Sequence, residues 1–225
     1  MANFSSKVDI PSRFLFLFAF PCRYVENLSE VEELPDECVL PNIETLERPE
    51  AATPTAEVRT AWNFEGLAFQ FTISGKKKAL WCNPNRPDES DRVELWLDTR
   101  NTKNVHRATR FCHRFACMPT GWGEGDEATV LPLLINRAKQ APNDVPHGSI
   151  HVRSRITDSS WSMYVFFTAA SLTGFDPREF REIGINWEVI DRDTGIRTLS
   201  AGSPFPYQEN PTLWQTLVLA NEQPE

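Results

Sequence analysis

From Val58 to the C-terminus, short segments with a two-residue hydrophobic period follow one another, separated by turns rich in Gly, Pro, Asn and Asp. This period places alternate side chains on opposite faces of a strand. Many short strands with few helical periods between them are typical of a β-sandwich or barrel. We therefore expect an all-β fold, a jelly-roll-like antiparallel β-sandwich. The predicted strands cover residues 58–64, 67–73, 92–98, 108–117, 129–136, 149–156, 161–169, 183–190 and 213–219.

Two local signals refine this prediction. The segment 63–66, Asn-Phe-Glu-Gly, lies between the first two predicted strands and indicates a tight hairpin turn, in which Gly66 is free to take a positive φ. Residues 177–182 have a helical pattern, with Asp176 as a candidate N-cap and Pro177 at the first helical position. We expect one short helical turn there.

The length of 225 residues fits a single β-domain over residues 56–220, with an N-terminal extension at 1–55 and a tail at 221–225. Residues 13–20 contain an apolar run that predicts a strand buried on both faces. Residues 24–56 are rich in acidic residues and proline, which indicates loop and edge structure. Two roles are open for the extension: it completes the sandwich, or it covers a binding face.

The composition excludes several classes of protein. Hydrophobic residues at 40% and charged residues at 24% fit a globular chain, and no window approaches the roughly 18 apolar residues that span a bilayer. A net charge of -8 disfavours nucleic acid as a partner. Five cysteines without paired spacing argue against a disulfide framework. Because the run at 14–20 also lacks a small-x-small cleavage site, a cytoplasmic location is favoured over secretion.

The segment Val93–Asp98 is the most informative part of the chain for function. Its positions 93, 95 and 97 are apolar and share one face, whereas Glu94, Trp96 and Asp98 share the other. A sandwich strand buries its apolar face. We expect the second face to be available to a ligand.

This segment and the turn before it resemble the family 9 carbohydrate-binding modules and their DOMON-like relatives, whose corresponding strand has the pattern D-x-V-E-hydrophobic-x-hydrophobic-D. The matching positions here are 91, 93, 94, 95, 97 and 98. The family's closing order of strand, short turn or helix, strand and final strand is similar to that of residues 161–167, 171–175, 183–191 and 211–217. The resemblance covers roughly residues 55–220 and implies a non-catalytic module that binds a saccharide or another small polar ligand.

The resemblance also implies a site. Glu94 matches the family's sugar-contacting carboxylate, and the strand from 109 to 115 matches the one that carries a guanidinium. Asn186 and Glu188 share one face of a later strand and would complete a polar floor beside Glu94. An alternative for Glu94 is an ordinary cross-strand ion pair on a solvated sheet. The candidate ligand-binding residues are Glu94, Trp96, Arg110, Arg114, Asn186, Glu188, Trp81 and Trp122.

The chain departs from the family at the two tryptophans that hold a terminal sugar. The corresponding segments, 85–89 and 200–202, contain no aromatic residue. Trp81, Trp122, Phe205 or Tyr207 could substitute for them. If none does, the chain is a structural or protein-interaction β-sandwich that has lost the sugar site, and its partner is a protein.

Acidic loops suggest a structural calcium ion. Asp191 and Asp193 lie in a short loop with alternating oxygen ligands, and Asp88 and Asp91 lie in a second acidic loop. The alternative for the first loop is an Asp-Gly hairpin turn. A further alternative follows from the DOMON relatives that bind haem, although no spacing singles out a pair of ligands. The candidate haem ligands are His106, His113, His147, His151 and Met118.

The sequence does not indicate an enzyme. No Gly-x-Ser-x-Gly elbow, phosphate loop or dinucleotide fingerprint is present. Glu94 and Asp98 would lie about 13 Å apart on one strand, beyond the roughly 6.5–9.5 Å of an inverting glycosidase. We therefore expect a binding protein.

Overall fold

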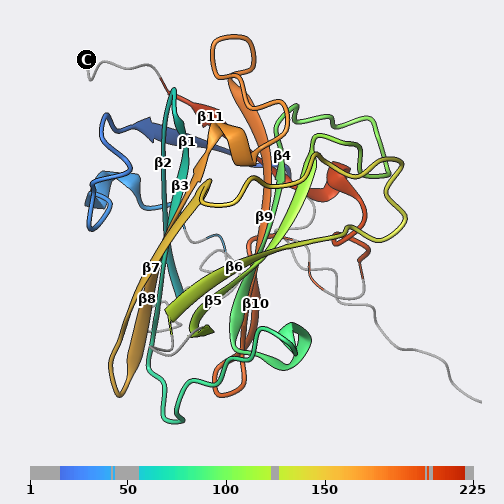
Figure 1. The fold of residues 1–225 in the computed structure, drawn as a ribbon. Coiled ribbons are helices and arrows are strands. Elements are labelled where there is room, and N and C mark those ends of the chain that lie inside the picture. The colour runs from blue at the N-terminus through green and yellow to red at the C-terminus, as the bar shows by residue number, and fades with distance from the viewer. Residues whose placement is uncertain are drawn as a thin grey trace, which may run out of the picture.

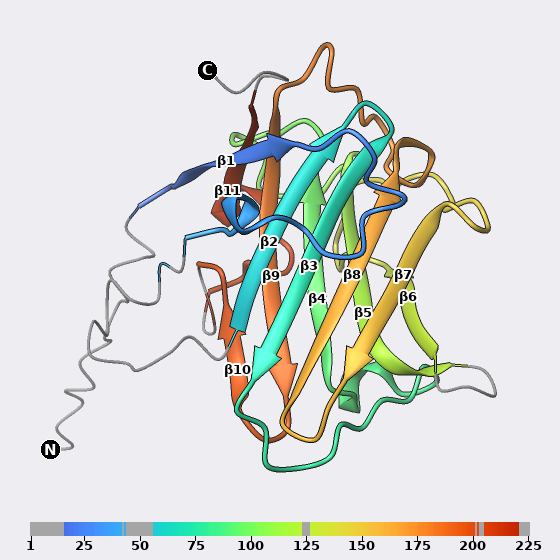
Figure 2. The same ribbon diagram turned by 90° about the vertical axis from the view of Figure 1, so that its left-hand side faces the viewer.

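The computed structural model describes residues 16–41, 43, 56–122, 127–200, 202 and 205–220. The described part of the chain is built from strands and four short 3₁₀ turns, which confirms the predicted all-β fold. In Figure 2 one sheet lies in front of the other, so that the molecule has two layers. The 3₁₀ turns are η2 (Asp36–Cys38), η4 (Pro87–Glu89), η5 (Ala169–Ser171) and η6 (Pro211–Leu213).

We call the two layers sheet A and sheet B; strand β1 belongs to both (Figure 1). Sheet A has the order β6 (Glu127–Leu133), β5 (Cys112–Trp122), β4 (Arg92–Asp98), β9 (Glu182–Asp191), β11 (Gln215–Leu219) and β1 (Ala19–Tyr24), and β10 (Gly195–Thr198) pairs with β9. Sheet B has the order β1, β2 (Ala56–Asn63), β3 (Gly66–Ser74), β8 (Ser160–Thr168) and β7 (Ile150–Ile156).

Strand β1 joins the sheets. Its first half pairs in parallel with β11, with Ala19 opposite Thr216, and its second half pairs in parallel with β2, with Arg23 opposite Ala61. The other strand pairs are antiparallel. The N-terminal strand was expected at 13–20, buried on both faces. Residues 13–15 lie outside the described residues, the observed strand begins at Ala19, and its residues are alternately exposed and buried.

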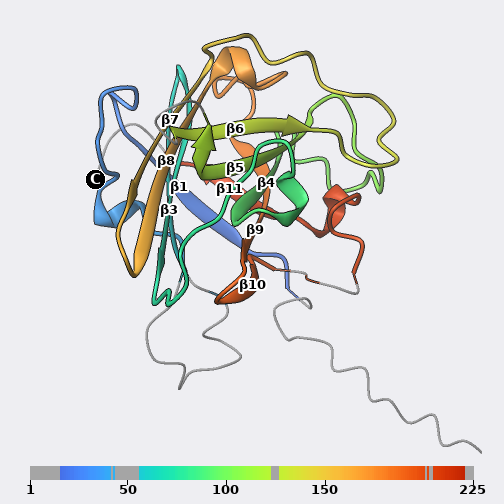
Figure 3. The same ribbon diagram turned by 60° about the horizontal axis from the view of Figure 1, so that its bottom comes forward.

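The two ends of the strand order approach each other. In Figure 3 β5 and β6 lie close to β7, and the Ser154 hydroxyl on β7 donates a hydrogen bond of 2.6 Å to the carbonyl oxygen of Pro119 on β5. The mixed sheet therefore nearly closes into a barrel.

The main core lies between the sheets. The apolar side chains at positions 93, 95 and 97 of β4 are buried there, as the period of two predicts. From β5, Phe115 packs against Phe167 of β8 with ring centroids 4.6 Å apart. Aromatic rings from both sheets interdigitate in this way and contribute much of the buried apolar area.

The hairpin between β2 and β3 forms as predicted, but for a different reason. The Asn63 side-chain oxygen accepts hydrogen bonds from the backbone N–H groups of Glu65 and Gly66. Gly66 does not have a positive φ. A Cβ atom at this position would lie 2.1 Å from the carbonyl oxygen of Phe167, so glycine is required by the close approach of β8.

The helical turn predicted at 177–182 is present as a single turn, but it ends earlier than predicted. Residues 177–179 form a turn, and Glu182 already begins β9. The Asp176 carboxylate accepts a hydrogen bond of 3.0 Å from the backbone N–H of Arg178, and the Asp176 carbonyl accepts one from Phe180. Asp176 therefore caps one helical turn, as predicted, and the chain then enters β9.

The N-terminal part covers one outer face. After β1, residues 25–40 cross the outer side of β2 and β3 (Figure 2). Arg59 of β2 binds this segment through an ion pair of 2.9 Å with Asp36 and a hydrogen bond of 2.6 Å to the carbonyl of Leu34. The remaining extension, 44–55, and the tail, 221–225, lie outside the described residues. A small second core forms beneath the segment from Leu28, Leu34, Cys38, Ala61, Ala68, Tyr164 and Phe166.

Candidate functional site

The outer face of sheet A is covered, contrary to the prediction that it is available. Glu94, Trp96 and Asp98 are each at most 1% exposed. The reason is that loops fold back over β4, so a strand that is polar on one side is buried on both. The residues packed with Trp96 in this third core are Ala108, Cys112, Ile135, Tyr207 and Trp214.

Strand register brings the predicted polar floor together beneath this cover. Glu94 lies directly opposite Glu188 of β9, and Trp96 lies between Asn186 of β9 and Arg114 of β5. Directly opposed residues of antiparallel strands share a face. Three other predicted site residues, Arg114, Asn186 and Glu188, therefore lie next to Trp96 and Glu94 on this face.

Two arginines hold the Glu94 carboxylate from both sides. The Nε and Nη2 atoms of Arg92 lie 2.9 and 2.6 Å from Oε1, and the same atoms of Arg114 lie 2.9 and 2.6 Å from Oε2. Each oxygen therefore accepts two charged N–H bonds, which uses its lone-pair directions. The sequence analysis missed Arg92, although its position two residues before Glu94 places it on the same face.

Tyr207 covers the polar face at Glu188. Its hydroxyl donates a hydrogen bond of 2.8 Å to Oε1 of Glu188, and its ring meets Trp96 edge-on at 5.7 Å. The Tyr207 carbonyl in turn accepts a hydrogen bond of 2.7 Å from the indole of Trp214. Burial raises the pKa of Glu188; the nearby Glu94 carboxylate raises it further, against the lowering effect of the Tyr207 hydrogen bond.

Two donors on this face lack an acceptor. The Trp96 Nε1 and Asn186 Nδ2 atoms are buried and have no hydrogen-bond partner among the described residues. The Asn186 oxygen accepts a long hydrogen bond of 3.4 Å from Ser200. Because an unmet buried donor costs free energy, these groups gain from an acceptor that reaches them.

The other predicted ligand-binding residues lie elsewhere. Arg110 is exposed in the turn before β5, with its guanidinium 5.0 Å from the Phe111 ring centroid, so it is not part of the floor. The Trp81 ring contacts Arg86 at 6.0 Å and Arg192 at 5.2 Å. The side chain of Trp122 lies outside the described residues.

Comparison with solved structures identifies the architecture. The chain is similar to a family 9 carbohydrate-binding module from Caldicellulosiruptor kristjanssonii in complex with glucose, with a TM-score of 0.61 and 13% identity over 92% of this chain and 98% of the other. It is also similar to a family 9 module from the same organism in complex with cellotriose, with a TM-score of 0.58 and 12% identity over 90% and 93% of the two chains. The chain has the fold of a family 9 carbohydrate-binding module. No family sequence model and no curated protein matches its sequence.

This family 9 fold confirms the resemblance drawn from residues 91–98, while the DOMON-like part of it stays a prediction. At 12–13% identity the likeness concerns the fold alone. In the described residues no helix is long and apolar enough to cross a membrane.

In this family 9 fold, the acidic loops expected to hold calcium converge on a lysine. The Lys76 ammonium binds the buried carboxylate of Asp191 and lies 3.8 Å from that of Asp91. Asp193 accepts backbone N–H bonds from residues 77 and 78, and the Asp88 side chain is 88% exposed. These four side chains therefore do not form a calcium cage, and the described residues contain no cluster of three or more His, Cys, Asp or Glu able to hold a metal.

The Lys76 contact sets the charge state of Asp191. Burial by itself raises the pKa of this carboxyl, but hydrogen bonds from Lys76 and from the backbone of residues 193 and 194 outweigh burial and lower it. The ammonium thus supplies the positive charge that joins the β9–β10 turn to the loop before β4.

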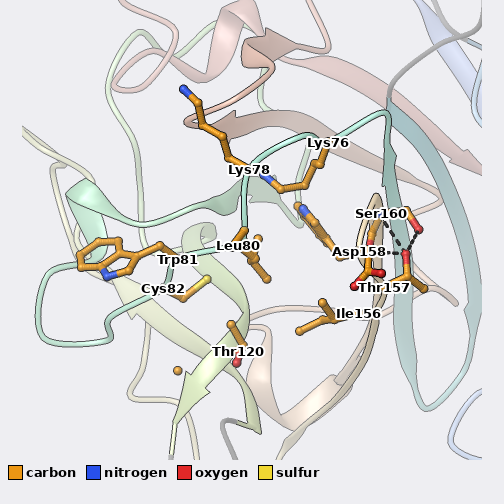
Figure 4. Close-up of a pocket in the computed structure, with 13 residues that line it drawn as sticks. Lys76, Lys78, Leu80, Trp81, Cys82, Thr120, Ile156, Thr157, Asp158 and Ser160 are labelled. Atoms are coloured by element: carbon orange, nitrogen blue, oxygen red, sulfur yellow. Dashed lines mark hydrogen bonds between the residues drawn. The ribbon is translucent and has the colours of Figure 1, made fainter.

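A pocket of about 640 Å³ lies beside these loops (Figure 4). Leu80, Thr120 and Ile156 face its centre, and the β7–β8 turn with Asp158 forms one wall. The Trp81 ring projects away from it in Figure 4. Neither Glu94 nor an arginine lines the pocket, so it is separate from the polar floor.

The histidines do not assemble into a haem site in the described part of the chain. His113 is buried and stacks on Phe115 with ring centroids 5.8 Å apart. Burial lowers the pKa of His113 to about 4, although the hydrogen bond that its ring donates to the backbone carbonyl of Thr173 raises the pKa. Met118 is buried on β5, and the histidines at 106, 147 and 151 are exposed.

Proposed function

We propose that the chain is a non-catalytic binding module that holds a saccharide or another small polar ligand against the outer face of sheet A. The observation that carries the proposal is the side-on pair of Arg114 and Glu94 beside Asn186 and Glu188, on one face of a family 9 fold. The two similar proteins are in complex with glucose and cellotriose, which supports a sugar as the ligand class.

The chemistry of this floor suits vicinal hydroxyls. A sugar hydroxyl donates one hydrogen bond and accepts others, so it is recognised by carboxylates and N–H groups placed side by side. Glu188 supplies an acceptor, and the unmet Nδ2 of Asn186 and Nε1 of Trp96 supply donors. A ligand hydroxyl would replace the Tyr207 hydroxyl at Glu188.

The proposal excludes catalysis by the same carboxylates. A general acid needs a proton that it can transfer, and each Glu94 oxygen already accepts two N–H bonds from arginine. Glu188 stands directly opposite Glu94 on the neighbouring strand, and its Oε1 atom accepts the hydrogen bond from Tyr207.

A second candidate is a structural or protein-interaction domain that has lost the sugar site. The burial of the floor favours it, since Glu94 is 1% exposed and Tyr207 is 4% exposed. In that case the Arg92–Glu94–Arg114 network fixes the pairing of β4 with β5 and contacts no ligand.

Titration with glucose, cellotriose and a panel of other sugars, followed by tryptophan fluorescence, tests the proposal. We expect a saturable change in the natural protein, its loss in Arg114→Lys, and its retention in the control Arg110→Lys. Lysine keeps the charge of Arg114 but cannot form the side-on pair of hydrogen bonds. A flat response from the folded natural protein contradicts saccharide binding on sheet A and favours the interaction domain.

A further inference from the structure

The outer face of sheet B carries a second, separate polar surface. Residues 25–40 cover β2, β3 and the part of β8 with Tyr164 and Phe166, and leave β7 uncovered (Figure 2). A hollow of about 460 Å³ lies there, with Glu32 and Glu33 of the covering segment on its rim. Strand register places six side chains in neighbouring pairs along it: Gln70 and Thr72 of β3, Tyr164 and Ser162 of β8, and Arg153 and Arg155 of β7.

Arg153 is held in place but has unmet donors. Its guanidinium lies 3.8 Å from the centroid of the Tyr164 ring, and this ring is fixed by a hydrogen bond of 2.6 Å from the Tyr164 hydroxyl to the carbonyl of Leu28. The buried Nε and Nη2 atoms of Arg153 have no hydrogen-bond partner among the described residues. Arg155, two residues along the same face, is exposed, and no ion pair is found for it in the described part of the chain.

The Nε and Nη2 atoms form the edge of the guanidinium with which an arginine can bind a carboxylate. The same chain shows this use twice, because Arg92 and Arg114 each hold Glu94 through Nε and Nη2. A guanidinium that slides on the Tyr164 ring can turn this edge toward the hollow and keep its stacking. A carboxylate would then satisfy both donors of Arg153.

The groups around Arg153 restrict the kind of ligand that can present this carboxylate. The hydroxyls of Thr72 and Ser162 lie 3.3 Å apart on the floor, so the floor also offers hydrogen bonds to neutral polar groups. The rim carboxylates of Glu32 and Glu33 balance the two arginines and would repel a ligand with many negative charges. Glu32 can accept a hydrogen bond from a ligand hydroxyl.

We propose that this face binds an acidic saccharide, with the carboxylate of a uronic acid residue on Arg153 and Arg155 and its ring hydroxyls on Thr72, Ser162 and Glu32. The proposal rests on the saccharide-binding function proposed above but uses the opposite face of the sandwich. The surface would recognise a ligand by one negative charge and several hydroxyls.

Nuclear magnetic resonance titration of the full chain with sodium D-glucuronate, D-glucose and sodium acetate tests it. We expect saturable shifts at backbone amides of β7 and β8 with glucuronate, and much weaker ones with glucose or acetate. Arg153→Gln should weaken glucuronate binding about tenfold, as expected for the loss of a charged hydrogen-bonded pair worth ~1.4 kcal/mol. Arg155→Gln should weaken it less, and Arg110→Gln, on an exposed turn, should leave it unchanged.

Three results would overturn the proposal: no saturable glucuronate shifts on β7 and β8, equal binding of acetate, or unchanged affinity in folded Arg153→Gln. An incorrect proposal for sheet B can be distinguished from an incorrect proposal for sheet A. Binding of glucuronate through Arg153 without any response to glucose or cellotriose would support this face and contradict the other. Cellotriose binding through Arg114 without glucuronate binding would do the reverse.

Discussion

The Tyr207 hydroxyl donates a hydrogen bond of 2.8 Å to the Glu188 carboxylate, at the point where a ligand hydroxyl is proposed to bind. Tyr207→Phe removes this donor and leaves a buried carboxylate oxygen without it. We expect a loss of about 1.5–3 kcal/mol in the free energy of unfolding, the range for hydrogen bonds to charged groups. Urea denaturation measures it. Tyr24→Phe, whose hydroxyl has no hydrogen bond among the described residues, is the control, and equal losses in both variants would contradict the assigned contact.

Glu94→Gln should destabilise the protein strongly. The substitution removes the negative charge between Arg92 and Arg114. It leaves the buried Arg92 with only the exposed Asp88, 3.9 Å away, and takes the ion-pair partner of the half-buried Arg114. Breaking a buried ion pair on one side costs about 3–5 kcal/mol. The matched control is Glu89→Gln, which breaks the exposed pair with Arg86 and should cost at most about 1 kcal/mol. A loss in Glu94→Gln no larger than in this control would show that the network contributes little.

Lys76→Ala should make the stability of the protein depend on calcium. In the natural protein the Lys76 ammonium pairs with Asp191 and lies 3.8 Å from Asp91, which also pairs with Arg192, so we expect the melting temperature to be the same with calcium and with a chelator. The variant leaves two buried carboxylates facing each other and should melt lower, with partial recovery when calcium is added. Lys78→Ala, which removes an exposed side chain from the same loop, should show neither effect. Calcium-dependent melting of the natural protein would contradict this account.

His113 should make the protein less stable in mild acid. Burial lowers the pKa of His113 to about 4 from 6.5, so between these values the unfolded chain binds a proton that the folded chain excludes. The free energy of unfolding should therefore fall by about 3 kcal/mol as the pH drops from 6.5 to 4, and level off below that. Urea titrations across this range measure the slope.

His113→Asn, which keeps a donor near the Thr173 carbonyl but does not titrate, should remove this part of the pH dependence. The exposed His151 provides the control, because His151→Asn should leave the slope as it is in the natural protein. An unchanged slope in folded His113→Asn would assign the acid sensitivity to other groups.

Strand positions and the inner face were predictable because both depend on local sterics. The period of two in residues 92–98 matches β4, and its apolar positions lie in the core. The Asp176-Pro177 signal correctly marked the start of one helical turn, but the turn ends earlier than predicted because Glu182 already belongs to β9. Gly66 was correctly placed in a turn, but its close contact with Phe167 connects residues about a hundred positions apart and leaves no local trace.

The sequence by itself determined the all-β class, the family 9 resemblance and the set of polar residues that share the face of Glu94. Only the tertiary structure decided that this face is covered, that Arg92 completes the grip on Glu94, and that Lys76 lies between the acidic loops. The physical reason is the separation along the chain between the residues that determine each feature. Alternation along a strand is fixed by neighbouring residues, whereas the burial of a polar face depends on loops such as the one carrying Tyr207, which reach it only when the whole chain has folded.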